Sequence, residues 1–147
     1  MVHFVMDEQD VRFVMRHPLS MFGTDGFGLA PNGVLAEGQP HPRCYGTYPR
    51  ILGHYVRDQQ VLGLEEAVRK ASFLPAERLG LATRGRVQTG AEADLVVFDP
   101  ETIEDTATYE QPHRFPRGID YVLVGGQIAV DHGLVTSARA GKVLRRP

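Results

Sequence analysis

Residues 2–23, which read VHFVMDEQDVRFVMRHPLSMFG, predict a strand, a helix and a second strand in that order. The apolar run Val2–Met6 is typical of a short buried strand. Asp7 is a suitable N-cap for the helix that follows, and Pro18 ends that helix. Leu19–Gly23 is a second short apolar run. This order is typical of a parallel βαβ unit, whose strands need further neighbours to cover the sheet.

The second predicted strand leads into an irregular segment. Residues 26–40 are rich in glycine and proline and have no apolar periodicity. Irregular loops of this length in a compact domain are usually functional or mobile. Three helical patterns follow: one with Pro49 in its first turn, one over Glu65–Phe73, and a short one with Pro75 in its first turn and Gly80 just past its end.

Near residue 82 the pattern changes from helical to β. The expected elements are a strand over Asp94–Pro100 and a hairpin whose strands, Ile119–Val124 and Gln127–Asp131, flank a two-glycine turn. The predicted fold class is therefore α/β plus β, divided into residues 1–80 and residues 82–147.

The composition excludes several functional classes. The 147 residues include 16 Lys and Arg against 18 Asp and Glu, a net charge of −2, so no basic excess suggests nucleic acid. No stretch approaches the roughly 18 apolar residues of a membrane span. The lack of an export signal predicts a cytoplasmic protein. The single cysteine, Cys44, allows no internal disulfide and is expected to be a packed small hydrophobe rather than a nucleophile.

Asp25 is the strongest single candidate for chemistry. It follows the predicted strand Leu19–Gly23, and ligands of parallel α/β folds bind at the carboxyl ends of the strands. A carboxylate there can ligate a metal or act as a general base. The alternative is that Asp25 only forms a turn with Gly26.

Arg43 and His41 lie in a proline-rich stretch, Pro40–Arg43. A guanidinium held by such a segment suits bidentate binding of a carboxylate, although an exposed structural arginine is the alternative. His41 is a candidate ligand or proton carrier, or else a hydrogen-bonding residue that orients the loop. The six histidines form no His-x-His or related motif, so the chain encodes no complete metal site that can be read from spacing.

Several stretches carry a resemblance to a known family, among them Gly23–Gly26, Pro40–Arg43, Tyr45–Gly53, Tyr55–Arg57 and Ala93–Asp99. Together they resemble the C-terminal third of N-acyl-D-amino-acid deacylases (D-aminoacylases) of the amidohydrolase superfamily. The resemblance implies a (β/α)₈ barrel with a small β-sandwich. Residues 1–80 would be the last barrel strands and trailing helices, with Leu19–Gly23 as strand eight. Residues 82–147 would be the C-terminal contribution to the sandwich.

The resemblance also implies roles for the candidate residues. Asp25 would take a proton from a zinc-bound water and pass it to the leaving amine. Arg43 would bind the α-carboxylate of a small N-acyl-D-amino acid, with His41 in the same substrate site. Zinc would be the cofactor, but most of its ligands are missing from this chain. A barrel needs about 250 residues, so the chain is expected to be inactive alone and to need a missing N-terminal segment or a partner chain.

Two alternatives remain open at the level of the sequence. The first is a non-catalytic folded module that assembles as an oligomer, because a partial barrel would leave sheet edges and apolar faces exposed. The second is a fragment of another amidohydrolase that acts on cyclic amides. The stretch His41–Arg43 argues against the second, since a cyclic diamide offers no α-carboxylate to bind.

Overall fold

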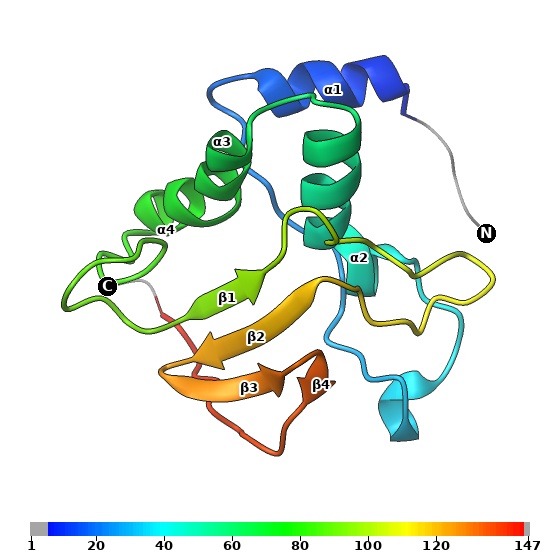
Figure 1. Ribbon diagram of the computed structural model, residues 1–147, viewed down its shortest axis with the longest axis vertical. Helices are drawn as coiled ribbons and strands as arrows, with labels where there is room; N and C mark the ends of the chain where they lie inside the picture. The colour runs from blue at the N-terminus through cyan, green and yellow to red at the C-terminus, as the bar shows by residue number, and fades with distance from the viewer. Residues whose placement is uncertain (1–5, 146–147) are drawn as a thin grey trace.

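The computed structural model describes residues 6–145 and divides into a group of helices and an antiparallel sheet (Figure 1). The helical elements, several of which run into one another, are α1 (Glu8–Arg16), η1 (Gly33–Ala36), α2 (Arg43–Arg50), η2 (Ile51–Asp58), α3 (Leu64–Val68), η3 (Arg69–Phe73) and α4 (Leu74–Leu79). The strands are β1 (Leu95–Phe98), β2 (Ile119–Val124), β3 (Gln127–Asp131) and β4 (Leu134–Val135). None of the helices within residues 6–145 is long and apolar enough to cross a membrane.

Helix α1 forms where its capping residues predict it. The Asp7 carboxylate accepts a hydrogen bond of 2.7 Å from the backbone N–H of Gln9, and acidic residues occupy the first turn. His17, before the predicted stop at Pro18, is the C-cap. The prediction of this helix and of its N-cap is therefore confirmed.

The predicted strand Leu19–Gly23 is wrong. The segment is irregular, and its Phe22 N–H donates to the carbonyl of Lys70 on η3 instead of to a strand, at 3.0 Å. A short apolar run becomes a strand only where a neighbouring strand offers matching backbone groups, and residues 6–145 provide none beside it. Of the other predicted strand, residues 2–5 lie outside the described residues.

The position of Pro49 is also different from the prediction. Pro49 lies inside α2, which begins six residues earlier at Arg43, rather than in the first turn of a helix. Because proline has no N–H, it interrupts the regular ladder of hydrogen bonds, and the next stretch, η2, is π-helical. The third helical prediction is confirmed: Pro75 lies in the first turn of α4, and Gly80 ends it in a left-handed conformation with φ 74°.

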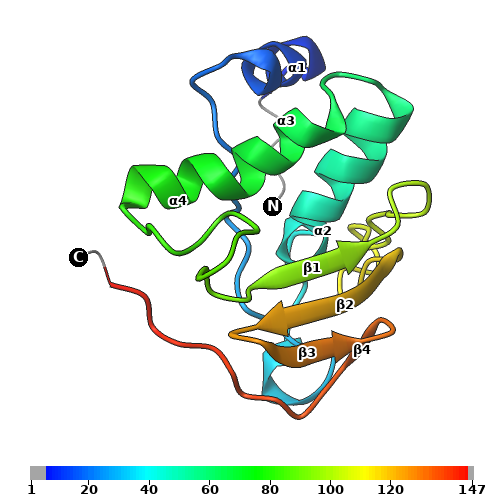
Figure 2. The same cartoon turned by 60° about the vertical axis from the view of Figure 1, so that its left-hand side comes forward.

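The sheet is an antiparallel meander with strand order β1-β2-β3-β4. Leu95 of β1 is paired with Leu123 of β2. Gly125 and Gly126 join β2 to β3 with φ values of 55° and 80°, as a two-residue hairpin requires, so the predicted hairpin is confirmed. Figure 2 shows β1 as the strand nearest the helices and β4 as the farthest.

The helices and the sheet region are joined by a tightly packed segment that precedes β2. Ile103 is only 2% exposed, and the Arg57 guanidinium of η2 donates to its carbonyl at 2.8 Å. Gly53 lets η2 approach the same carbonyl so closely that a Cβ would clash with it.

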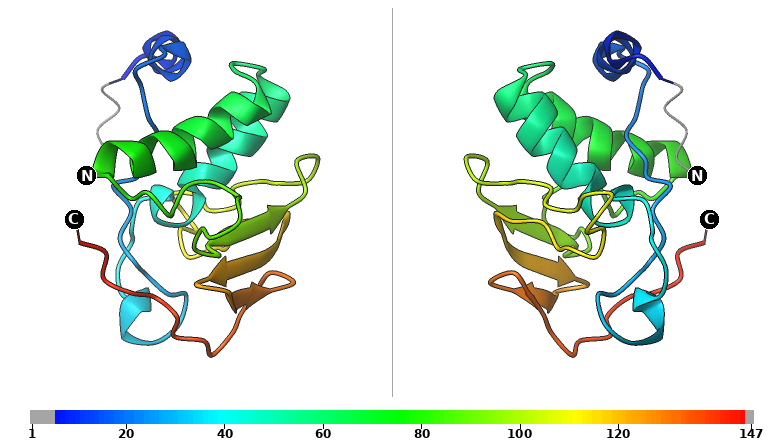
Figure 3. Two further views of the ribbon diagram at one scale, coloured as in Figure 1. Left: turned by 90° about the vertical axis from the view of Figure 1, so that its left-hand side faces the viewer. Right: turned by 90° about the vertical axis from the view of Figure 1, so that its right-hand side faces the viewer.

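The main apolar cluster lies among the helices and consists of Met15, Ile51, Tyr55, Val61 and Ala67. Figure 3 shows α1 above the other helices, joined to them by an extended segment that descends past them.

Candidate functional site

Two of the three candidate residues share one cavity. Asp25 and Arg43 line a cavity of about 580 Å³ together with Gly23, Thr24 and Thr47. Gly23, Thr24 and Asp25 come from the irregular segment after α1. Arg43 and Thr47 come from α2. The cavity therefore lies where a loop meets a helix N-terminus.

Asp25 and Arg43 form an ion pair in this cavity. Arg43 Nη1 donates to Asp25 Oδ2 at 2.5 Å. The Asp25 side chain is 78% exposed and the Arg43 side chain 41% exposed. An exposed ion pair contributes only about 0–1 kcal/mol to stability. Either partner can therefore exchange the other for a ligand at small cost.

A chain of hydroxyl hydrogen bonds fixes the loop that carries Asp25. Thr47 Oγ1 donates to the carbonyl of Arg43 at 2.9 Å, so the hydroxyl of Thr24 must donate to Thr47 Oγ1, also at 2.9 Å. Thr24 Oγ1 in turn accepts the N–H of Gly26 at 2.9 Å. A Cβ on Gly26 would lie 3.0 Å from the Cα of Cys44, so glycine permits this close approach of loop and helix.

His41 lies next to Arg43 but is not among the residues that line the cavity. Its Nδ1 accepts the backbone N–H of Arg43 at 3.0 Å, and its Nε2 contacts the hydroxyl of Tyr109 at 3.1 Å. Partial burial lowers the pKa of His41, the positive charge of Arg43 lowers it further, and Asp25 opposes both effects. His41 is therefore favoured in its neutral form, as an acceptor for the first residue of α2.

This environment predicts the effect of pH on His41. Because its folded-state pKa lies below the unfolded value, the neutral ring contributes stability that is present above about pH 6.5 and is lost as the pH falls through the lowered pKa. Arg43 and Asp25 are the charged groups that face the ring. We expect the difference in unfolding free energy between wild type and His41→Asn to be constant above about pH 6.5 and to change as the pH falls through the lowered pKa. A constant difference at every pH would contradict this assignment.

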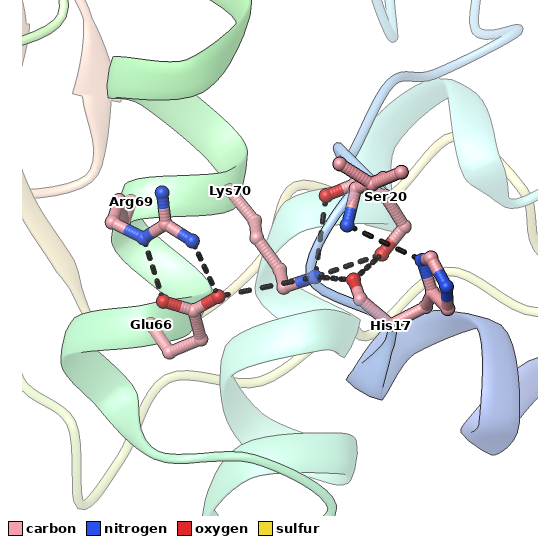
Figure 4. A network of polar contacts seen from close by, with 6 residues as sticks. His17, Ser20, Glu66, Arg69 and Lys70 are labelled. Carbon is pink, nitrogen blue, oxygen red and sulfur yellow. Dashed lines mark hydrogen bonds and ion pairs between the residues drawn. The ribbon is translucent and has the colours of Figure 1, made fainter.

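A buried lysine fixes the turn that precedes the Asp25 loop. The Lys70 side chain is 0% exposed, and its Nζ donates to the carbonyl of His17, to the carbonyl of Ser20 at 3.2 Å and to Ser20 Oγ at 2.8 Å (Figure 4). Glu66 lies 3.9 Å from the ammonium and accepts two hydrogen bonds from Arg69. The hydrogen bond from Arg69 lowers the pKa of Glu66, which keeps a negative charge beside Lys70.

The structure also shows which metal ligands this chain can offer. Within residues 6–145, no three His, Cys, Asp or Glu side chains gather closely enough to hold a metal ion. Asp25 is the one carboxylate in the cavity, and a catalytic zinc site needs about three protein ligands. Among residues 6–145, no other His, Cys, Asp or Glu lines this cavity.

Sequence reasoning missed Tyr109 and the bridging role of Thr24 and Thr47. Tyr109 is 68 positions from His41, and no local pattern links the two residues. Thr24 stands two residues before Gly26, a spacing that suits a hydroxyl-to-backbone turn, and this signal was available in the sequence.

Comparison with known proteins decides the family. The profile of the amidohydrolase family matches residues 9–130. The chain belongs to the amidohydrolase family. This amidohydrolase chain is 46% identical over 145 residues to a D-aminoacylase and 39% identical over 143 residues to an N-acyl-D-aspartate deacylase, both of Alcaligenes xylosoxydans xylosoxydans. The alignments cover 99% and 97% of the chain but only 28% and 27% of those relatives.

Solved structures agree with this assignment. A D-aminoacylase crystal structure, described as defining a novel subset of amidohydrolases, matches with a TM-score of 0.86 and 45% identity, over 96% of this chain and 28% of that one. An N-acyl-D-glutamate deacylase from Bordetella bronchiseptica, in complex with zinc and a phosphonate inhibitor, matches with a TM-score of 0.76 and 43% identity, over 84% and 25% of the two chains. The resemblance to N-acyl-D-amino-acid deacylases is thus confirmed for this amidohydrolase.

Proposed function

We propose that this chain is the C-terminal part of a zinc-dependent amidohydrolase that hydrolyses N-acyl-D-amino acids to a D-amino acid and a carboxylate. The observation that carries the proposal is the meeting of Asp25 and Arg43, at 2.5 Å, in one cavity. A carboxylate and a guanidinium are two of the groups that the reaction needs, one to move a proton and one to hold the α-carboxylate of the substrate. The deacylase relatives support the substrate class.

Each residue has a distinct part in this proposal. Asp25 accepts a proton from the attacking water and returns it to the amine nitrogen as the amide C–N bond breaks. Arg43 binds the α-carboxylate of the substrate with its planar guanidinium. His41 belongs to the substrate site because its ring accepts a hydrogen bond from the backbone N–H of Arg43. Zinc, when bound, supplies a water of lowered pKa and polarises the amide carbonyl.

Substrate binding would exchange the partners of Arg43. The ion pair with Arg43 occupies Oδ2 of Asp25. The α-carboxylate of the substrate offers Arg43 an equivalent partner, which frees Asp25 to face the reacting water. The high exposure of the Asp25 side chain leaves room for this rotation. The binding of the substrate α-carboxylate to Arg43 thus also releases Asp25 to act as the base.

The proposal includes a division of the chain. Residues 1–80 would belong to the end of a (β/α)₈ catalytic barrel and residues 82–147 to the C-terminal part of a β-sandwich, in a cytoplasmic enzyme. The remaining barrel segments would precede this chain or lie on a partner, and the isolated chain would be inactive. The chain spans about 28% of the length of the D-aminoacylase that it matches.

A second candidate, a non-catalytic module that assembles with other chains, draws support from exposed apolar side chains. Phe13 on α1 and Leu19 in the following segment are largely exposed. Two observations together would favour this candidate over the hydrolase. The isolated chain would form a stable oligomer, and longer proteins that contain the chain would show no hydrolase activity.

The hydrolase is tested by fusing residues 1–147 to the N-terminal portion of a D-aminoacylase. We expect the zinc-loaded fusion to hydrolyse N-acetyl-D-amino acids, to leave the L enantiomers intact, and to lose activity to a chelator until zinc is restored. The isolated chain is the control and should be inactive. Hydrolysis of both enantiomers, or full activity after the metal is removed, would contradict the proposal.

A further inference from the structure

A segment from the sheet region contacts both the loop that precedes Arg43 and helix α2, which carries Arg43. We call residues 107–115 the site arm; in Figure 1 it is part of the yellow segment beside α2. Gln39 Nε2 donates to the carbonyl of Tyr109 at 2.6 Å, and His113 Nε2 lies 3.2 Å from the carbonyl of Gly38. The hydroxyl of Tyr45 lies 3.0 Å from His113 Nδ1. The site arm therefore holds the chain on both sides of His41.

We propose that Tyr109 positions Arg43 for substrate recognition by holding the ring of His41 in one orientation. This inference rests on the proposed function, because it assumes that Arg43 binds the substrate carboxylate. Tyr109 is a positioning residue: it touches His41, and His41 touches the backbone of Arg43.

The direction of the hydrogen bonds fixes the tautomer. His41 Nδ1 accepts the N–H of Arg43, so in the neutral ring the proton resides on Nε2. That Nε2–H then donates to the oxygen of Tyr109, 3.1 Å away. The ring also packs edge-on against the Tyr109 ring, with centroids 5.1 Å apart. The other tautomer would direct a hydrogen from Nδ1 at the N–H of Arg43.

The ring of His41 caps the start of helix α2. Pro42 occupies the N-cap position and makes no side-chain hydrogen bond to the helix. Ordinary caps use a Ser, Thr, Asp or Asn oxygen for this purpose. His41 takes that role for Arg43, and Tyr109 keeps the ring in place. The loop that carries Asp25 has further hydrogen bonds of its own, through the hydroxyls of Thr24 and Thr47, besides the ion pair of Asp25 with Arg43.

Because the Asp25 loop has these additional hydrogen bonds, we expect Tyr109 to affect substrate binding more than the chemical step. In the zinc-loaded fusion, Tyr109→Phe should raise KM for N-acetyl-D-amino acids about threefold to tenfold, as expected for the loss of one hydrogen bond, and change kcat less than about twofold. KM for an N-acyl amine that lacks the α-carboxylate should not change. Tyr121→Phe is the matched control, since Tyr121 also contacts a histidine Nε2, that of His132, at 2.7 Å.

A double-mutant cycle tests the route through His41. The asparagine of His41→Asn can still accept the N–H of Arg43 but is too short to reach Tyr109. We therefore expect Tyr109→Phe to have no further effect on KM in the His41→Asn background. Nitrogen NMR gives an independent readout: the His41 ring should be the Nε2–H tautomer in both the wild-type fusion and Tyr109→Phe, and loss of the hydrogen bond to Tyr109 should shift the Nε2 resonance in Tyr109→Phe.

Specific outcomes overturn the inference. Equal losses with both substrates would show that Tyr109 is only structural, and an unchanged KM together with an unchanged Nε2 resonance would show that it does not position Arg43. Failure of the proposed function has a different signature. In that case Arg43→Met leaves KM for the carboxylate substrate unchanged, whereas the Nε2 resonance of His41 still responds to Tyr109→Phe.

Discussion

Asp25→Asn is expected to lower kcat for N-acetyl-D-amino acids by about 10²–10⁴-fold in the zinc-loaded fusion, the range for loss of a general base. Asparagine has nearly the same shape and can still contact Arg43, but it cannot accept a proton from water. The defect should therefore appear in kcat, while KM changes little. Steady-state kinetics on N-acetyl-D-amino acids measure both constants.

Asp58→Asn is the matched control for this experiment. Asp58 is another partly exposed aspartate in an ion pair with an arginine, Arg57, at 2.7 Å, but it lies at the end of η2. We expect this variant to keep the wild-type kcat. If Asp25→Asn also retains the wild-type rate, Asp25 is not the residue that moves the proton.

Arg43→Met is expected to reduce kcat/KM for N-acetyl-D-amino acids by about 10²-fold, because truncation of a charged partner leaves the substrate carboxylate unpaired in the site. The loss should fall mainly on KM. Arg43→Lys should restore only part of the activity, since an ammonium cannot form the two parallel hydrogen bonds of a guanidinium. Kinetics with a substrate and with its carboxylate-free analogue separate binding from chemistry.

The same substitution at Arg12 provides the control. Arg12 forms an ion pair with Glu8 on α1 at 3.2 Å, so Arg12→Met removes a comparable exposed pair that does not line the cavity. We expect Arg12→Met to leave both kinetic constants unchanged. An equal loss with the carboxylate-free analogue in Arg43→Met would show that Arg43 supports the fold and not the recognition of the carboxylate.

Elements whose ends are set by local chemistry could be predicted from the sequence. Asp7 caps α1 with its own side chain, Gly80 supplies the left-handed residue after α4, and Gly125 and Gly126 supply the positive φ values of the hairpin. In each case, the residues within one turn of the chain determine the conformation. Distant neighbours are not needed to specify these features.

Features that depend on distant partners could not be predicted in the same way. Leu19–Gly23 has the composition of a strand, but its hydrogen bond goes to Lys70 on η3. The start of α2 was missed because a histidine ring, positioned by Tyr109 from the sheet region, replaces an ordinary cap. Asp25 and Arg43 were recognised as candidates separately and through the family resemblance. Their contact across 18 positions needed the structure.

A crystal structure of the zinc-loaded fusion with a phosphonate mimic of an N-acyl-D-amino acid tests most directly whether Asp25 and Arg43 serve one reaction centre. We expect the Arg43 guanidinium to bind the carboxylate of the inhibitor, and the Asp25 carboxyl to leave Arg43 and lie about 3 Å from a phosphonate oxygen. Asp25 still paired with Arg43, with the inhibitor bound elsewhere, would contradict the account.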